Sequence, residues 1–176
     1  MRKLKLYIAV SLDGKIASKD GSVDWLEKIP NPDQTDYDYQ SFFETVDITL
    51  MGHSTYKSVN LQEHGDVYPG KENYVFTRDA SIPSTEYFNF ISQDPVEFIK
   101  PRLNEEGGDI WLIGGAQLNS MFFKAGMVDE IRMHIMPVAL GEGIDLLTEE
   151  IPFQLYKLEG TKSYASGTVM LTYSKA

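Results

Sequence analysis

The chain has 176 residues and no cysteine, and its 16 Lys and Arg against 26 Asp and Glu give a formal net charge of −10. At roughly 100–200 residues per domain, this length predicts a single domain over residues 1–176. The lack of cysteine excludes thiol nucleophiles, zinc-thiolate sites, iron–sulfur clusters and disulfides. The acidic balance argues against nucleic acid or an anionic membrane as a partner.

The first residues, Met1–Tyr7, run directly into a strand-like pattern and do not have the apolar core and cleavage site of a signal peptide. No apolar run approaches the roughly 18 residues that a membrane-spanning helix needs. We therefore expect a cytoplasmic protein.

Short apolar or β-branched runs bounded by Gly, Asp and Pro recur along the chain and are typical of strands. They cover Leu4–Ser11, Ile48–Met51, Tyr74–Thr77, Ile110–Ile113, Glu130–Met136 and Thr168–Ser174. Helices are predicted between them, at Tyr37–Glu44, at Thr55–Val59, after the capping pair Asp94-Pro95, and at Ala116–Ala125 before Gly126. This alternation predicts an α/β domain with a largely parallel sheet, to which Phe153–Leu158 and Thr168–Ser174 add an antiparallel edge.

Three predicted strands end in segments suited to ligand binding: Ser11-Leu12-Asp13-Gly14, Met51-Gly52-His53-Ser54-Thr55 and Gly114-Gly115-Ala116. In open α/β sheets, ligands bind beyond the carboxyl ends of the strands. The second and third segments join a glycine turn to a helix start, where unpaired N–H groups favour an anion. Two such turns suit a dinucleotide, although the glycine pair is also explained by a tight turn and Ser54 or Thr55 by helix capping.

Arg78 follows a predicted strand and stands next to the hydroxyl residue Thr77. An arginine beside a hydroxyl at a strand end is a suitable partner for a ribose 2′-phosphate. The alternative is a solvated arginine that pairs with Asp79.

Six short motifs in order make the chain resemble the dihydrofolate-reductase-like superfamily, which includes the reductase domain of the bifunctional riboflavin-biosynthesis deaminase-reductase. The motifs are Ala9–Ala17 with Asp24-Trp25, Met51–Tyr56, Pro69–Asn73, Thr77-Arg78, Ile113–Ala116 and Pro137–Gly143. The resemblance implies a three-layer α/β/α fold and NADPH as the cofactor. A chain of this length without cysteine is expected to correspond to the reductase half alone.

The resemblance also implies which residues bind the cofactor. Ala9 and Ile16 would flank the nicotinamide amide, and Asp13 with Gly14 would shape the turn beneath the ring. The pyrophosphate would be bound by Ile113, Gly114, Gly115, Ala116 and Gln117. The other phosphate turn would consist of Gly52, His53, Ser54 and Thr55. Thr77 and Arg78 would face the 2′-phosphate. The loop from Ala17 to Trp25 would form a lid over the nicotinamide.

Departures from the folate-reducing members bear on the substrate. Asp36 has the spacing before Gly52 expected of the acid that holds a pterin, but Asp38 competes for this role, and both acids are also explained as first-turn residues of a helix. Lys71 stands where a tail-binding arginine is common, and Met133 stands where a threonine would orient the acid. The segment Pro137–Gly143 favours the riboflavin-type branch.

The sequence therefore predicts an NADPH-dependent reductase that transfers hydride to a pyrimidine- or pteridine-related substrate, most like 5-amino-6-(5-phosphoribosylamino)uracil reductase. Asp36 or Asp38 is the candidate catalytic acid. The alternatives are a dihydrofolate reductase and an NADPH-binding module without catalysis. The resemblance to the riboflavin-type reductases implies a homodimer. No metal is expected, because His53, His64 and His134 do not have the spacing of metal ligands.

Overall fold

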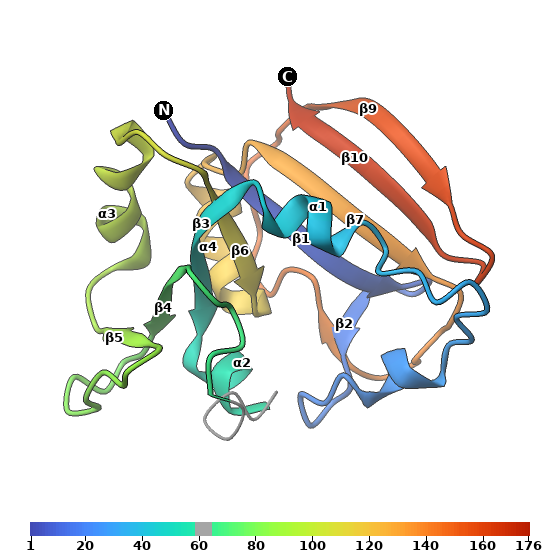
Figure 1. The fold of residues 1–176 in the computed structure, drawn as a ribbon, viewed down its shortest axis with the longest axis horizontal. Coiled ribbons are helices and arrows are strands. Elements are labelled where there is room, and N and C mark those ends of the chain that lie inside the picture. Colours follow the sequence, from blue (N-terminus) through green and yellow to red (C-terminus); the bar gives the residue numbers. More distant parts are fainter. Residues whose placement is uncertain (59–64) are drawn as a thin grey trace.

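The computed structural model describes residues 1–58 and 65–176. Its main sheet has eight strands in the order β5-β4-β3-β6-β1-β7-β10-β9 (Figure 1). These strands are β1 Leu4–Ser11, β3 Val46–Gly52, β4 Glu72–Phe76, β5 Asn89–Ile91, β6 Asp109–Gly114, β7 Glu130–Met136, β9 Tyr156–Ser163 and β10 Val169–Lys175. A second, two-stranded sheet pairs β2, Lys15–Ala17, with β8, Ile144–Asp145.

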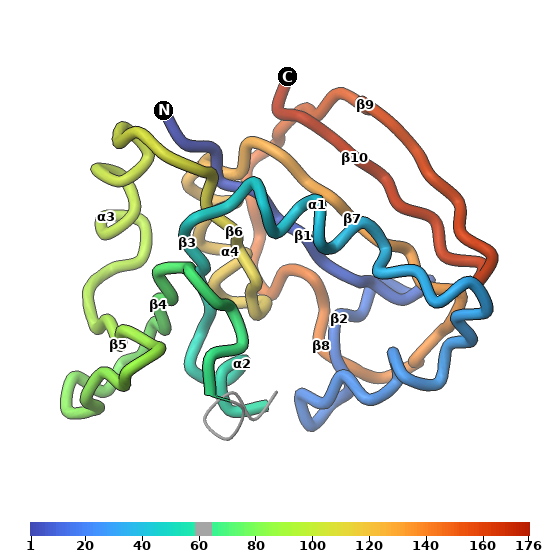
Figure 2. The backbone as a smooth tube through the Cα atoms, viewed as in Figure 1, coloured from blue at the N-terminus to red at the C-terminus, as the bar shows by residue number. Residues whose placement is uncertain are grey.

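The six strands from β5 to β7 pair in parallel, whereas β10 is antiparallel to β7 and β9 is antiparallel to β10. Figure 2 shows the β9–β10 hairpin at the opposite side of the molecule from β4 and β5. The predicted sheet, mostly parallel with an antiparallel C-terminal edge, is confirmed.

Helices cover both faces of the sheet, and each face has its own apolar core. The helices are α1 Tyr39–Phe43, α2 His53–Ser58, α3 Pro95–Ile99 and α4 Ala116–Lys124, with short 3₁₀ helices η1 Asp24–Lys28 and η2 Arg102–Asn104. In β1, Leu4, Leu6 and Ile8 join the core that contains Phe98 of α3 and Phe122 of α4. Tyr7 packs on the other face, against the core of Phe42 and Trp111. In Figure 1 α1 lies in front of the sheet and α4 behind it, which gives the three-layer α/β/α arrangement.

Of the elements predicted with both ends, only the strands at Leu4–Ser11 and Glu130–Met136 have the predicted bounds; the others differ by one or more residues. The helix predicted from Tyr37 begins at Tyr39, because Tyr37 (φ +56°) and Asp38 (φ +64°) have left-handed backbones that cannot continue a helix. The strand predicted at Phe153–Leu158 begins at Tyr156 and runs to Ser163. The predicted helix end at Val59 lies outside the described residues. No described helix has both the length and the apolar character that crossing a membrane would require.

The helix α4 is held to the sheet by Phe122, whose side chain is fully buried. Truncating such a phenylalanine removes apolar contact and leaves a cavity, at a typical cost of about 3–5 kcal/mol. We predict that Phe122→Ala lowers the free energy of unfolding by this amount in urea denaturation. Lys124→Ala, at an exposed position of the same helix, should change it by less than about 0.5 kcal/mol. Equal effects of the two substitutions would contradict this packing.

Candidate active site

The predicted cofactor residues gather along one edge of the main sheet. The strands β4, β3, β6 and β1 are neighbours and run parallel, so their carboxyl ends meet at the same edge. Thr77 follows β4, Gly52 ends β3, Gly114 ends β6, and Ala9 lies near the end of β1. Residues that are more than 100 positions apart in sequence are therefore aligned along one edge, as the sequence predicted.

The turns after β3 and β6 lie next to each other, and a side chain at Gly115 would meet a tight contact. A Cβ atom built on Gly52 would lie 3.9 Å from the backbone nitrogen of Gly115, and one built on Gly115 would lie 3.0 Å from Thr55 Oγ1. Gly114 has φ +115°, a conformation that favours glycine, and the Gly114–Gly115 peptide is cis. These turns fit a nucleotide, because glycine lets the backbone approach the ligand and α4 begins immediately afterwards, at Ala116.

A buried acceptor lies below the turn after β6. The Asn119 side chain is fully buried, and its Nδ2 donates to Leu146 O at 3.2 Å. Its Oδ1 has no hydrogen-bond partner among the described residues, and it would lie 3.3 Å from a Cβ atom on Gly114. An unpaired buried acceptor is costly, so this turn has an unused hydrogen-bonding position.

The turn after β3 reaches the end of β4 through a contact between two predicted cofactor residues. His53 Nδ1 and Thr77 Oγ1 are 3.5 Å apart, and Thr77 Oγ1 also accepts from the Asp79 backbone N–H. Partial burial, and then Lys57, lower the pKa of His53, so the imidazole needs a more acidic pH to become a cation.

Arg78 is exposed and forms no hydrogen bond or ion pair within residues 1–58 and 65–176. The carboxylate of Asp79 instead accepts from the backbone and side chain of Ser81, at 2.9 and 2.6 Å. The alternative pairing of Arg78 with Asp79 is therefore not formed, and the guanidinium group is available at the β4 end of the edge.

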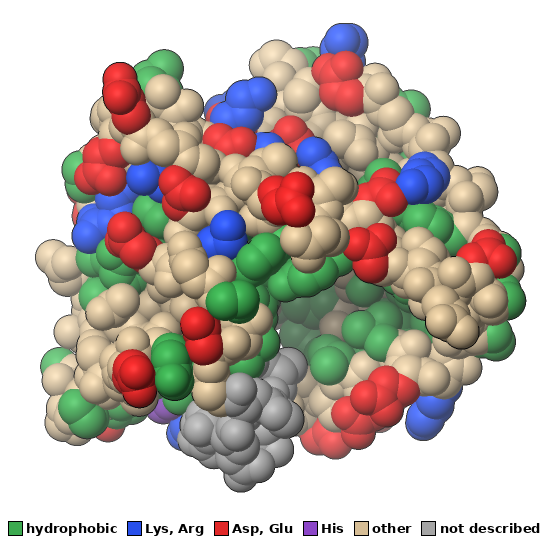
Figure 3. Space-filling model, in the orientation of Figure 1, with side chains coloured by type: hydrophobic (Ala, Val, Ile, Leu, Met, Phe, Trp, Pro, Cys, Tyr) green, Lys and Arg blue, Asp and Glu red, His purple; other side chains and the backbone are tan. Residues whose placement is uncertain are grey.

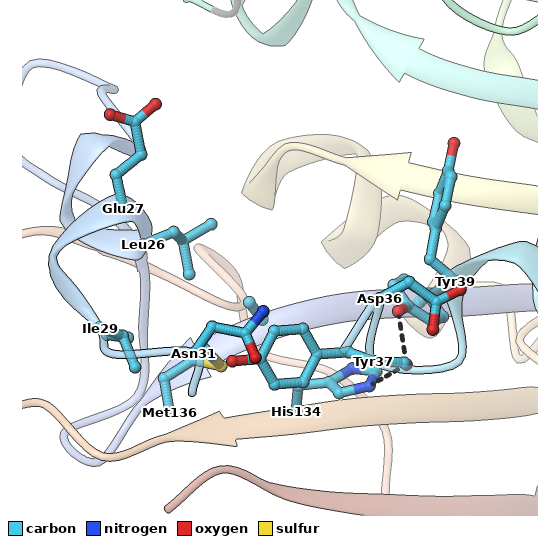
Figure 4. A pocket seen from close by; sticks show the side chains of 11 residues that line it. Leu26, Glu27, Ile29, Asn31, Asp36, Tyr37, Tyr39, His134 and Met136 are labelled. Carbon is cyan, nitrogen blue, oxygen red and sulfur yellow. Dashed lines mark hydrogen bonds between the residues drawn. The ribbon is translucent and has the colours of Figure 1, made fainter. Parts of the chain in front are cut away.

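A pocket of about 480 Å³ adjoins this edge at Ala9. Figure 3 shows the molecule hollowed here, with hydrophobic side chains gathered between α1 and η1. In Figure 4, Leu26 and Glu27 lie on one side, Asp36 and Tyr39 on the other, and His134 and Met136 below. The lining residues are Tyr7, Ala9, Leu26, Glu27, Ile29, Asn31, Asp36, Tyr37, Tyr39, His134 and Met136.

The backbone carbonyl of Tyr37 joins three segments of this pocket. It accepts from Tyr7 Oη at 3.0 Å and lies 3.1 Å from His134 Nε2 (Figure 4). Since a carbonyl can only accept, Nε2 of His134 carries the hydrogen. Burial raises the pKa of Tyr7 and lowers that of His134, so both side chains are neutral at pH 7.

The structure separates the two candidate acids. Asp36 lines the pocket, and its carboxylate accepts from the backbone N–H groups of Asp38 and Gln40, at 3.0 and 2.9 Å. The bond from Gln40 is the main cause of its lowered pKa, so Asp36 is ionised and acts as an acceptor. Asp38 does not line the pocket and instead pairs with Lys162 at 2.5 Å. Asp36 thus has a capping role and also a place in the pocket.

Asp13 holds two loops together and does not line the pocket. Its carboxylate accepts from Ser11 Oγ at 2.6 Å and from the N–H groups of Leu140 and Gly141, at 2.9 and 2.7 Å. These bonds, that from Ser11 first, lower the pKa of Asp13 to about 2. Gly14 follows with φ +80°, as a tight turn requires.

The pocket is lined by residues that directly follow the predicted lid, Ala17 to Trp25, and not by the lid itself. Trp25 is buried in η1 and its Nε1 has no partner among the described residues, whereas Leu26, Glu27 and Ile29 line the pocket. Ile16 packs against the core from β2.

Sequence reasoning missed much of the pocket and assigned one residue to the wrong face. Met133 packs against the core and cannot take the place of a threonine beside the acid; the neighbouring His134 faces the pocket. Alternation along strands was the available signal, since Tyr7 and Ala9 share one face of β1, and His134 and Met136 share one face of β7.

Lys71, expected where a tail-binding arginine is common, does not line the pocket. Its Nζ donates to Val46 O at 2.6 Å and lies 4.4 Å from the centre of the Phe43 ring. Among the described residues, no group of three His, Asp or Glu side chains could hold a metal. His64 lies outside them.

The fold and this sheet edge define a dihydrofolate-reductase-like α/β domain. The family model of the RibD C-terminal domain matches residues 2–172, so the chain belongs to that family. Two Bacillus subtilis (strain 168) relatives are "Uncharacterized protein YwjB", 39% identical, covering 99% of both chains, and "Uncharacterized protein YyaP", 32% identical, covering 98% of this chain and 94% of the relative.

Solved structures share the fold. A "Putative riboflavin biosynthesis protein" from Shewanella sp. PV-4 is 26% identical, with a TM-score of 0.85 over 99% of both chains. A Thermotoga maritima diaminohydroxyphosphoribosylaminopyrimidine deaminase/5-amino-6-(5-phosphoribosylamino)uracil reductase is 17% identical, with a TM-score of 0.70; the match covers 99% of this chain and 57% of that one. Acinetobacter baumannii RibD is 17% identical, with a TM-score of 0.75 over all of this chain and 58% of that chain.

The burial of His134 predicts a pH dependence of stability. Its pKa is lowered in the folded chain, whereas an unfolded histidine titrates near about 6.5. As the pH falls below that value the unfolded chain takes up the proton first, so folding stability decreases. We predict that the melting temperature falls between pH 7 and 5.5, and falls less in His134→Gln, whose amide can still donate to Tyr37.

At pH 8, His134 is neutral in the folded and in the unfolded chain. The melting temperatures of the wild-type protein and of His134→Gln should therefore respond alike to a further rise in pH. If the melting temperatures of the wild-type protein and of His134→Gln changed in parallel between pH 5.5 and 8, that result would contradict a buried, neutral His134.

Proposed function

We propose that the protein is an NADPH-dependent reductase that transfers hydride to a C=N or C=O group of a pyrimidine- or pteridine-related heterocycle. One observation carries the proposal: the glycine-lined sheet edge that suits a dinucleotide adjoins a pocket lined by aromatic side chains, and Ala9 belongs to both. Membership of the RibD C-terminal domain family supports the same reaction class.

The residues along the sheet edge would hold NADPH in strand order. Gly114, Gly115, Ala116 and Gln117 would bind the pyrophosphate, Gly52, His53, Ser54 and Thr55 the second phosphate turn, Thr77 and Arg78 the 2′-phosphate, and Ala9 and Ile16 the nicotinamide. When bound, the nicotinamide supplies the hydride. The contribution of the protein is to align the two reactants and to exclude water from the space between them.

Asp36 would orient the substrate. Its carboxylate is ionised and has acceptor capacity beyond its two backbone bonds, so it can accept N–H groups of a heterocycle. The neutral rings of Tyr7 and His134 would bound the same space and keep it low in dielectric.

Binding and turnover assays test the proposal. NADPH should quench protein fluorescence, and its absorbance at the nicotinamide band should fall when 5-amino-6-(5-phosphoribosylamino)uracil, the matching ribosylamine or dihydrofolate is added. Absence of NADPH binding would refute the reductase function. Turnover of dihydrofolate alone would favour the dihydrofolate reductase alternative, and binding without turnover would favour a module without catalysis.

Arg78 is the residue proposed to select NADPH over NADH. A charge-assisted hydrogen bond contributes about 1.5–3 kcal/mol, so Arg78→Ala should weaken NADPH binding by about ten- to hundredfold. NADH binding should change by less than about twofold, because NADH lacks the 2′-phosphate. Titration of both nucleotides, with Lys124→Ala as a charge-matched control, measures this difference. Equal losses for both nucleotides would refute the assigned role.

A homodimer is also proposed, and exposed apolar side chains near the last strand of the sheet support it. Phe153, Leu155 and Leu158 are 88%, 64% and 50% exposed, in or just before β9. We predict that Phe153→Glu shifts the protein toward monomer in analytical ultracentrifugation, whereas Leu12→Glu, which is 66% exposed at a different loop, does not. A wild-type monomer at all concentrations would refute the dimer.

The cytoplasmic location remains a prediction from the sequence.

A further inference from the structure

We propose that the pocket accepts an unphosphorylated flat heterocycle, neutral or cationic, and that its carboxylates reject a phosphorylated one. This inference rests on the proposed reductase function and narrows its substrate class. The eleven lining residues include Asp36 and Glu27 but no Lys or Arg. Residues 59–64, outside the described part of the chain, also contain no Lys or Arg.

Two cations that act electrostatically on pocket residues are already paired. Lys162, which acts on the charge of Asp36, forms an ion pair with Asp38 at 2.5 Å. Arg132, which acts on Tyr7, donates from Nε to Glu130 at 2.8 Å. Recruiting either cation to a phosphate would break its present ion pair, and that loss would offset part of the gain.

Backbone donors near the pocket are also engaged. A helix start can bind a phosphate through its free N–H groups. At α1, however, Asp36 accepts from the N–H groups of Asp38 and Gln40, so an acidic side chain from the pocket wall already occupies this position. A second anion at that position would meet the charge of Asp36 at short range.

Other polar groups of the lining are committed or uncharged. The Asn31 amide exchanges two hydrogen bonds with the backbone of Thr35, at 2.8 and 3.1 Å, and Tyr7 donates to the Tyr37 carbonyl. Among the side-chain donors of the lining, those that remain are neutral, such as the second N–H of the Asn31 amide and the hydroxyls of Tyr37 and Tyr39. Neutral donors cannot compensate for removing a doubly charged phosphate from water.

The aromatic walls favour a flat ring. The distance between ring centres is 4.7 Å for Tyr7 and His134, 6.2 Å for Tyr37 and His134, and 5.0 Å for Tyr37 and Tyr164. Such a packed set offers faces and edges for stacking, and the faces of tyrosines also attract cations. The two carboxylates would accept N–H groups of an amino-substituted ring.

The substrate inferred from these contacts differs from the phosphorylated one in the name of the Thermotoga maritima protein. The two ligands of a matched pair, 5-amino-6-(5-phosphoribosylamino)uracil and the same ribosylamine without phosphate, differ only in the group at issue. We expect calorimetric titration to give at least tenfold tighter binding of the unphosphorylated compound. Equal or tighter binding of the phosphorylated compound would overturn the proposal, and so would failure of both to bind.

NADPH binding is measured separately by fluorescence, so the two proposals can fail independently. Loss of NADPH binding with the ligand preference intact would refute the reductase function alone. NADPH binding with the preference reversed would refute only the substrate class.

A charge reversal at the pocket provides the sharper test. Glu27 lies on the pocket wall in η1 and is exposed, so Glu27→Lys should preserve folding and add the missing cation. We expect it to tighten binding of the phosphorylated compound by about tenfold and to narrow or reverse the preference. Glu105→Lys, which makes the same charge change at an exposed position outside the pocket lining, should leave the preference unchanged. Identical effects of the two substitutions would overturn the proposal.

Discussion

The candidate pocket depends on one carbonyl group, that of Tyr37. It accepts from Tyr7 on β1 and from His134 on β7, and so ties the segment before α1 to two neighbouring strands. The left-handed backbone at Tyr37 and Asp38 accompanies this arrangement and delays the start of α1 to Tyr39. The same turn brings Asp36 to the pocket wall, so the acid, the histidine and the tyrosine are positioned together.

The sheet edge follows from a different constraint, the parallel order of β4, β3, β6 and β1. Parallel strands bring all their carboxyl ends to one side, and the glycines there leave room for a ligand. In a chain with a net charge of −10, binding a polyanion such as NADPH works against the overall field. Backbone N–H groups at glycine turns add donors without adding charge, and Arg78 is the exposed cation at the far end of the edge.

Much of the sheet could be predicted from local pattern. The bounds of β1 and β7 were predicted to the residue, since β1 is rich in apolar residues and β7 alternates polar with apolar ones. The two- and three-residue strands β2, β5 and β8 carry too little pattern to be recognised, because short strands are defined by their pairing partners. The left-handed pair at Tyr37 and Asp38 has no glycine to mark it. On β7, the position expected beside the acid was Met133, but the neighbouring residue His134 faces the pocket. A shift of one residue is enough for this difference, because neighbouring strand residues face opposite sides of the sheet.

The Asp13 carboxylate has a consequence for motion. It receives N–H groups from Leu140 and Gly141 while bonded to Ser11, so the loop after β1 and the loop after β7 share one anchor. The small sheet formed by β2 and β8 joins the same two segments a few residues further on. Segments linked twice in this way open as one cooperative unit. Hydrogen exchange of residues 13–17 should therefore be coupled to that of residues 140–145, although more than 120 positions separate them in the chain.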